Sequence, residues 1–275
     1  MKEFILLIGH GSRDDDGNQE FIEFVDAVRK ELPNRDLEAS FLEFADPDID
    51  AGIEACVLRG ATRIVAVPVI LLAASHVKLE IPEFLERGRL AHPGVEIVYG
   101  RNVGLHEAIL GLLLERFREE LAQRKVANAE LKDTAIVLMG RGSSDPDANG
   151  DLYKIARMLW ERAGVITVET CFSGITTPLL PEGVKRTIAL GAKRVVVIPF
   201  FLFTGVLIKR MHGVLDEIQS EYPKIPMTMA GYFGFHRRLV DVLVDRIEEA
   251  ATARAFMNCD FCGYRPYHAN IATEG

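Results

Sequence analysis

The sequence repeats itself along its length, and this repeat constrains the fold more than any other feature. Gly9-His10-Gly11-Ser12 recurs as Gly140-Arg141-Gly142-Ser143, an offset of 131 residues. The same offset relates Gly60-Ala61-Thr62-Arg63 to Gly191-Ala192-Lys193-Arg194. One offset across distant landmarks indicates a duplication, so the chain is predicted to form two similar halves and a tail. The predicted segments are residues 1–125, 133–255 and 256–275.

Within each half, short apolar runs alternate with segments of helical spacing. The run 64–72 is continuously apolar, as expected of a strand covered on both faces. This alternation predicts an α/β fold in which each half has a four-stranded parallel sheet, right-handed crossovers and helices on both faces. In the first half, the expected strands are 4–8, 37–44, 64–72 and 95–99, and the expected helices are 18–32, 49–60, 75–87 and 106–123.

Composition narrows the class of protein. Hydrophobic residues make up 48% of the chain and charged residues 26%, which is typical of a globular protein. The net charge of −8 argues against a general nucleic-acid partner. No apolar run predicts a membrane span and no leader precedes the first strand, so we expect a cytoplasmic protein. Four cysteines do not make a disulfide scaffold, and Cys56 and Cys171 are expected to be inert core thiols.

Three potential metal ligands follow the first three expected strands. His10 stands in a Gly-flanked turn after the first, Glu43 at the end of the second, and His76 after the third. A strand order that begins 2-1-3 would bring these side chains together at the carboxyl ends, where open parallel sheets bind ligands. Two imidazoles and one carboxylate suit Co²⁺, Fe²⁺, Ni²⁺ or Zn²⁺, and three protein ligands leave coordination positions open.

The repeat supplies an internal control for these residues. The offset carries His10 to Arg141, Glu43 to Gly174 and His76 to Leu207, so no candidate ligand persists in the second half. Scaffold landmarks persist, which favours a functional role for the two histidines over a structural one; Glu43 could equally be a solvated strand end. In contrast, His106 and His236 occur at matching places in both halves, which predicts helix capping or packing.

Three motifs resemble a known family. Gly9-His10-Gly11-Ser12-Arg13, the segment 41–47 (FLEFADP) and the segment 68–82 (PVILLAASHVKLEIP) resemble the CbiX/SirB family of class II tetrapyrrole chelatases, which insert metal into sirohydrochlorin. The resemblance covers both halves and implies two flavodoxin-like halves. It implies that His10 and His76 bind the incoming metal, that His10 also accepts a pyrrole proton, and that Glu43 assists as a ligand or proton carrier.

The resemblance also implies where the substrate lies. The loop from Leu71 to Ser75 would lie against the macrocycle, and basic side chains would meet its carboxylates. Ser75 and Glu80 stand where the family often has Gly and Asp, which bears on loop geometry. The predicted substrate contacts are Ser12, Arg13, Asp46, Leu71, Leu72, Ala73, Ala74, Ser75, Lys78 and Arg141.

The tail contains a Cys-x-x-C pair, Cys259 and Cys262. Long CbiX-type chelatases are similar here and carry a tail associated with an iron–sulfur centre. Such a cluster generally takes four ligands, so two cysteines cannot complete it. Further ligands would come from a second copy of the chain, which supplies another pair, or from His268, which adds one. The alternative is a tail with two thiols kept reduced in the cytoplasm.

The leading hypothesis is a lyase that inserts Co²⁺ into sirohydrochlorin without a nucleotide, on the route to cobalamin, as a monomer or homodimer. Ferrochelatase action toward siroheme is the alternative, because the ligand set does not separate Co²⁺ from Fe²⁺. From another class, a non-catalytic carrier of a tetrapyrrole or phosphate ligand would not need His76. A metal-storage or sensor role has too few ligands.

Overall fold

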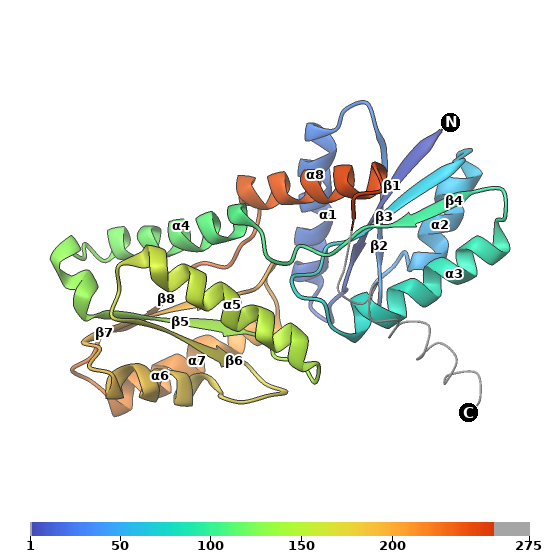
Figure 1. The fold of residues 1–275 in the computed structure, drawn as a ribbon. Helices are drawn as coiled ribbons and strands as arrows, with labels where there is room; N and C mark the ends of the chain where they lie inside the picture. The colour runs from blue at the N-terminus through green and yellow to red at the C-terminus, as the bar shows by residue number, and fades with distance from the viewer. Residues whose placement is uncertain (1, 256–275) are drawn as a thin grey trace. The chain divides into compact units, whose positions relative to one another are not determined.

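The computed structural model describes residues 2–255, which form two compact units (Figure 1). Of these residues, unit 1 contains 2–104 and 240–255, and unit 2 contains Leu105–Leu239. Each unit holds one four-stranded sheet in which every strand pair is parallel, as the sequence predicts. Among the described residues, no helix is both long and apolar enough to cross a membrane.

The sheet of unit 1 has the strand order β2-β1-β3-β4, which confirms the predicted order beginning 2-1-3. Strand β1 lies between β2 and β3, so the residues that follow these three strands emerge at neighbouring points of one edge. The elements are β1 (Glu3–Gly9), α1 (Asp15–Glu31), β2 (Asp36–Phe41), α2 (Ile49–Leu58), β3 (Arg63–Pro68), η1 (His76–Glu80), α3 (Ile81–Ala91) and β4 (Glu96–Tyr99).

Strand β1 is buried on both faces of this sheet. Phe4, Leu6 and Ile8 form one core cluster with apolar residues of α2 and α3. Ile5 and Leu7 alternate with them and are also fully buried, so the opposite face is covered as well. Burial on both faces explains why the strand reads as a continuous apolar run.

The sheet of unit 2 has the equivalent order, β6-β5-β7-β8. Helix α4 packs against α5 and β7 within this unit. The elements from α4 onward are α4 (Glu107–Gln123), η2 (Asn128–Asp133), β5 (Thr134–Gly140), α5 (Pro146–Ala163), β6 (Thr167–Phe172), α6 (Leu180–Ala189), β7 (Arg194–Pro199), α7 (Val206–Glu221), β8 (Met227–Met229) and α8 (Arg237–Ala251).

The compact units differ from the predicted halves, 1–125 and 133–255, because the last helices are exchanged. Helix α4 follows the strands of unit 1 but belongs to unit 2, whereas α8 beyond Leu239 belongs to unit 1. The two helices occupy equivalent places in the repeat and present equivalent apolar faces. Sequence periodicity alone therefore cannot say which sheet each one covers.

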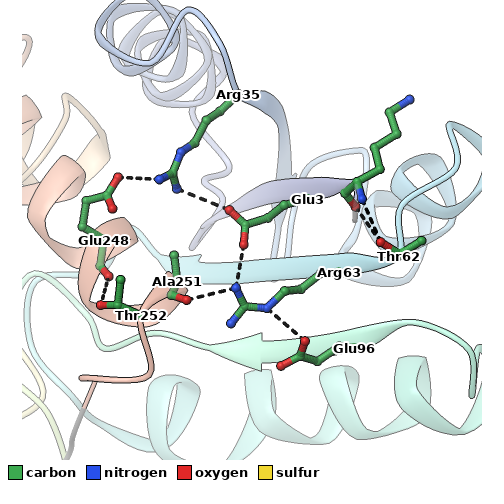
Figure 2. Close-up of polar contacts among 9 residues, drawn as sticks. Glu3, Arg35, Thr62, Arg63, Glu96, Glu248, Ala251 and Thr252 are labelled. Atoms are coloured by element: carbon green, nitrogen blue, oxygen red, sulfur yellow. Dashed lines mark hydrogen bonds and ion pairs between the residues drawn. The ribbon is translucent and has the colours of Figure 1, made fainter.

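Ion pairs hold the end of α8 on unit 1 (Figure 2). The guanidinium of Arg63 on β3 donates to Glu3 Oε2 at 2.6 Å and to the carbonyl of Ala251 at 2.9 Å. Arg35 joins Glu3 at 3.4 Å to Glu248 of α8 at 2.7 Å. The Arg63 side chain is only 11% exposed, so these contacts are partly screened from solvent. The end of α8 is thus an integral part of unit 1.

Candidate metal site

His10 and Glu43 are brought together by an extension of the β1–β2 pairing. Beyond the last strand residues, Leu42 N donates to the carbonyl of Gly9 at 2.9 Å and Glu43 N donates to the carbonyl of His10 at 3.0 Å. These bonds fix the backbone of the two candidate ligands against each other. The prediction that the first and second strand ends would meet is confirmed.

Gly11 makes this close approach possible. Its φ of +86° lies in the left-handed region, and a Cβ atom there would stand 1.6 Å from the carbonyl oxygen of Glu43. Gly142 repeats this geometry in unit 2, where the same atom would stand 2.2 Å from the carbonyl oxygen of Gly174. The second glycine of the motif is therefore a scaffold requirement shared by both halves, while the residue before it differs.

His76 reaches the site from a loop rather than directly from a strand. Strand β3 ends at Pro68, so the predicted strand 64–72 is too long. The chain then runs through residues 69–75 to η1, one turn of π-helix that begins at His76 and continues into α3. The predicted helix 75–87 is thus a π-turn followed by an α-helix ending at Ala91. Such turns are often found at functional sites.

The three candidate ligands form one cluster. His10, Glu43 and His76 each offer one ligand atom, and these atoms lie within 4.8 Å of one another. His10 Nε2 is 3.3 Å from Glu43 Oε1, and the His10 and His76 ring centroids are 4.7 Å apart. The side chains are 26%, 35% and 27% exposed, so the cluster is accessible without being on an open surface. This set fits a divalent ion with open coordination positions.

Neighbouring polar groups orient the two imidazoles. His10 Nδ1 donates to the carbonyl oxygen of Gly11 at 2.9 Å, so Nε2 is the ring nitrogen on the side of Glu43, 3.3 Å from its Oε1. His76 Nδ1 is buried and lies 2.9 Å from Glu80 Oε1, although the angles are not those of a hydrogen bond. Carboxylates beside ligand histidines are common in metal sites.

The other predicted contacts differ in their surroundings. The Ser12 hydroxyl accepts from Asp14 N at 3.0 Å, and Ser143 and Asp145 repeat this bond at the same length, so this contact belongs to the turn. Residues 71–74 and Lys78 are half-buried, whereas Ser75, Asp46 and Arg141 are exposed. All except Arg141 belong to unit 1, and Arg141 lies in unit 2.

Phe44 is a residue that the sequence analysis missed. It follows Glu43 directly, has a φ of +63° and is 52% exposed, and the Arg13 guanidinium lies 4.9 Å from its ring centroid. A large apolar side chain in the left-handed region is uncommon. Its position beside a candidate ligand in the 41–47 motif is the signal that could have identified it.

His106 and His236, which recur at matching places in the two halves, behave as the repeat predicts. His106 Nδ1 accepts from Ala108 N at 3.1 Å, and His236 Nδ1 accepts from Arg238 N at 3.2 Å. Both cap the first turn of a helix, α4 and α8 respectively, which confirms the capping interpretation. Cys56 and Cys171 are fully buried, as predicted.

Comparison with known proteins gives a consistent result. The CbiX family model matches residues 4–120 and 135–250. A sirohydrochlorin cobaltochelatase of Priestia megaterium is 45% identical over 262 residues, which cover 95% of this chain and 84% of that protein. A sirohydrochlorin ferrochelatase of the same organism is 34% identical over 250 residues, with 91% of each chain covered.

A solved structure is similar over nearly the whole chain. The sirohydrochlorin chelatase SirB from Bacillus subtilis subspecies spizizenii, in complex with cobalt, superimposes with a TM-score of 0.77 at 32% identity, covering 92% of this chain and 96% of that one. Fold and site together define a two-unit α/β protein with a cluster of three candidate metal ligands at one sheet edge. The chain belongs to the CbiX family.

Proposed function

We propose that the chain is a sirohydrochlorin chelatase that inserts a divalent metal ion, preferably Co²⁺, without a nucleotide. The observation that carries this function is the His10, Glu43 and His76 cluster, whose ligand atoms lie within 4.8 Å of one another. The preference for Co²⁺ rests on the 45% identity to a cobaltochelatase. Fe²⁺ is the second candidate, because the ligand set accepts both ions and a ferrochelatase is 34% identical.

In the proposed reaction the metal is a substrate held by an incomplete shell. His10, Glu43 and His76 bind the ion, and the macrocycle nitrogens replace them one after another. Insertion of a divalent ion releases two pyrrole N–H protons. Neutral His10 accepts one at Nε2, since imidazole is a suitable base near pH 7. Glu43, 3.3 Å from that nitrogen, stabilises the resulting cation, accepts the second proton and passes it to solvent.

The substrate contacts follow from the elements around this cluster. Residues 71–75 provide half-buried aliphatic surface for the flat macrocycle, with Ser75 at its exposed end. Phe44 adds an exposed ring beside Glu43, and Arg13 and Lys78 supply positive charge for the substrate carboxylates. Ser12 lies in the turn that follows His10, and Asp46 lies in the segment that follows Glu43. Arg141 remains a proposed contact from unit 2.

Anaerobic absorption spectra of sirohydrochlorin test the proposal. The macrocycle is mixed with the protein and Co²⁺, Fe²⁺ or Ni²⁺ in turn, and the spectral change on metallation is followed with time. We expect acceleration with Co²⁺ and to a smaller degree with Fe²⁺. Rates equal to the uncatalysed reaction for every ion would overturn the function. Tight macrocycle binding with those rates would instead identify a non-catalytic carrier.

A second part of the proposal concerns the tail. Cys259 and Cys262 lie outside the described residues, and their spacing supports an iron–sulfur centre shared between two copies of the chain. Anaerobically purified protein should then be brown, and Cys259→Ser should bleach it while metal insertion persists. Colourless protein without bound iron or sulfide would exclude the cluster. The cytoplasmic location and the choice between monomer and homodimer stay predictions.

A further inference from the structure

The loop 69–75, which leads from β3 to His76, is held by its backbone. Val69 N donates to the carbonyl of Ile8 at 2.8 Å, and Val103 N donates to the carbonyl of Ile70 at 3.0 Å. The carbonyl of Leu71 accepts two bonds, from Gly104 N at 2.8 Å and from the side-chain amide of Asn102 at 2.8 Å. Asn102 is thus the side chain that reaches across to this loop.

Asn102 is itself fixed from the opposite side. It is 6% exposed, and its carbonyl accepts from Arg246 Nε of α8 at 3.0 Å. Arg246 is 1% exposed and also donates from Nη2 to the carbonyl of Val103 at 2.8 Å, while its Nη1 pairs with Glu249 at 2.9 Å. A buried guanidinium that donates from Nε and Nη2 to two successive carbonyls of one short segment holds that segment in place.

Comparison with unit 2 shows which of these contacts are common to both halves and which occur only beside the candidate metal site. In unit 2, Arg116 donates to the carbonyl of Phe233 at 2.8 Å and pairs with Glu119, just as Arg246 does with Val103 and Glu249. The backbone bonds are also repeated, from Phe233 N to Phe201 O at 3.0 Å and from Gly234 N to Leu202 O at 2.7 Å.

One member of this arrangement is not repeated. The position equivalent to Asn102 is Tyr232, which carries no amide, and the loop of unit 2 leads to Leu207 where that of unit 1 leads to His76. The contacts of Arg246 in unit 1 and of Arg116 in unit 2 are therefore common to both halves. The hydrogen bond from a side-chain amide to the loop occurs in unit 1, where the loop leads to the candidate ligand His76.

We propose that Asn102 is a positioning residue for the metal site, which sets the loop 69–75 and thereby His76 through its bond to the Leu71 carbonyl. This inference rests on the proposed metal site. It depends on the proposed function only in experiments that measure metal insertion. The bond that the Asn102 side chain makes is to the backbone of Leu71 in the loop. Asn102 acts by limiting where the loop can place His76, since small displacements of ligands weaken a metal site.

The test is direct titration of Co²⁺ into the purified full chain without tetrapyrrole, followed by cobalt absorbance or calorimetry. Asn102→Leu keeps the branched shape and removes the amide, while Leu71 retains its bond to Gly104 N, so the chain should fold. The matched control is Ile53→Val, a buried core change on α2 in the same unit. Melting temperatures are measured for both.

We expect Asn102→Leu to weaken Co²⁺ binding by about tenfold, the scale seen when outer-shell partners are removed, and Ile53→Val to leave it unchanged. If Asn102→Leu does not fold, Asn102→Ser, which leaves room for a bridging water, should show the same direction. An unchanged affinity for Asn102→Leu, or an equal loss in Ile53→Val, would overturn the inference. If the wild-type chain binds Co²⁺ but inserts no metal, the proposed function fails while this comparison still decides the role of Asn102.

Discussion

The imidazole rings of His10 and His76 stand perpendicular to each other with their centroids 4.7 Å apart. They reach this arrangement from different strands, His10 at the end of β1 and His76 after the loop that follows β3. In this edge-to-face arrangement the rings are not stacked, so ring nitrogens of both histidines can face a common point. With the Glu43 carboxylate beside them, the two rings can share one ion.

Removing either imidazole should abolish metal insertion without unfolding the protein. For His10→Ala and His76→Ala we expect loss of Co²⁺ binding and of chelatase activity, with nearly unchanged melting temperatures, because these half-exposed side chains contribute little to the core. Activity and thermal melting are measured side by side. Full chelatase activity in His76→Ala would contradict the three-ligand site.

Three Gly→Ala variants distinguish the effect of backbone strain, of a steric clash and of damage to the metal site on stability and Co²⁺ binding. Gly60 has a φ of +87° and no atom near an added Cβ, so Gly60→Ala should lose only about 1 kcal/mol of stability for its backbone conformation. Gly11→Ala must also displace the Glu43 carbonyl, so it should lose more stability and Co²⁺ binding as well. Gly142→Ala, with its clash in unit 2, should lose stability and keep Co²⁺ binding.

Chemical denaturation and Co²⁺ titration of these variants provide the check. If Gly142→Ala lost Co²⁺ binding while still folded, the turn at Gly142 would be part of the metal site and not only a structural feature that both halves share. If Gly11→Ala behaved like Gly60→Ala, the close contact with Glu43 would be unimportant for the site.

The convergence of the site was predictable because it depends only on strand order and on which residues follow each strand. Parallel pairing aligns the carboxyl ends of β1, β2 and β3, and the repeat separates His10 and His76 from scaffold residues. The end of β3 was not predictable, because the sequence stays apolar through Leu72 while the strand stops at Pro68. The later apolar residues meet the 102–104 segment instead.

The exchange of α4 and α8 and the role of Asn102 lie beyond sequence periodicity for a different reason. Equivalent helices of a duplicated chain have interchangeable apolar faces, so only the path of the connecting segments decides which sheet each covers. Asn102 is one polar residue in a turn, and nothing in the local sequence shows that its amide would be buried against the Leu71 carbonyl.

The two core thiols should be inert until the protein unfolds. Burial raises the pKa of Cys56 from 9.0 to about 12, and burial likewise raises the pKa of Cys171. In a chain carrying Cys259→Ser and Cys262→Ser, a thiol reagent at pH 8 should therefore react only after denaturant is added. The unfolded chain loses the Cys56 proton near pH 9 while the folded chain keeps it, so the free energy of unfolding should fall as pH rises above 9. Rapid labelling of the native variant would contradict this burial.

The asymmetry between the halves makes a final prediction, for the positions in unit 2 that correspond to His10 and His76. Arg141 is exposed and replaces His10, so Arg141→Ala should leave stability within about 0.5 kcal/mol. If its charge meets a substrate carboxylate, KM should rise more than kcat falls, as when uniform binding is lost. Leu207 is half-buried and replaces His76, so Leu207→Ala should cost about 1–2 kcal/mol, less than a fully buried leucine, and keep Co²⁺ binding.

Steady-state kinetics, Co²⁺ titration and thermal melting of both variants, beside His10→Ala, decide this asymmetry. The first half carries the metal chemistry if Arg141→Ala still turns over at saturating substrate while His10→Ala does not. Because a removed surface charge can weaken substrate binding but cannot replace a lost metal ligand, the two variants should differ most in kcat. A folded Arg141→Ala protein as inactive as His10→Ala would place chemistry in the second half and refute the assignment of the metal site to His10, Glu43 and His76 alone.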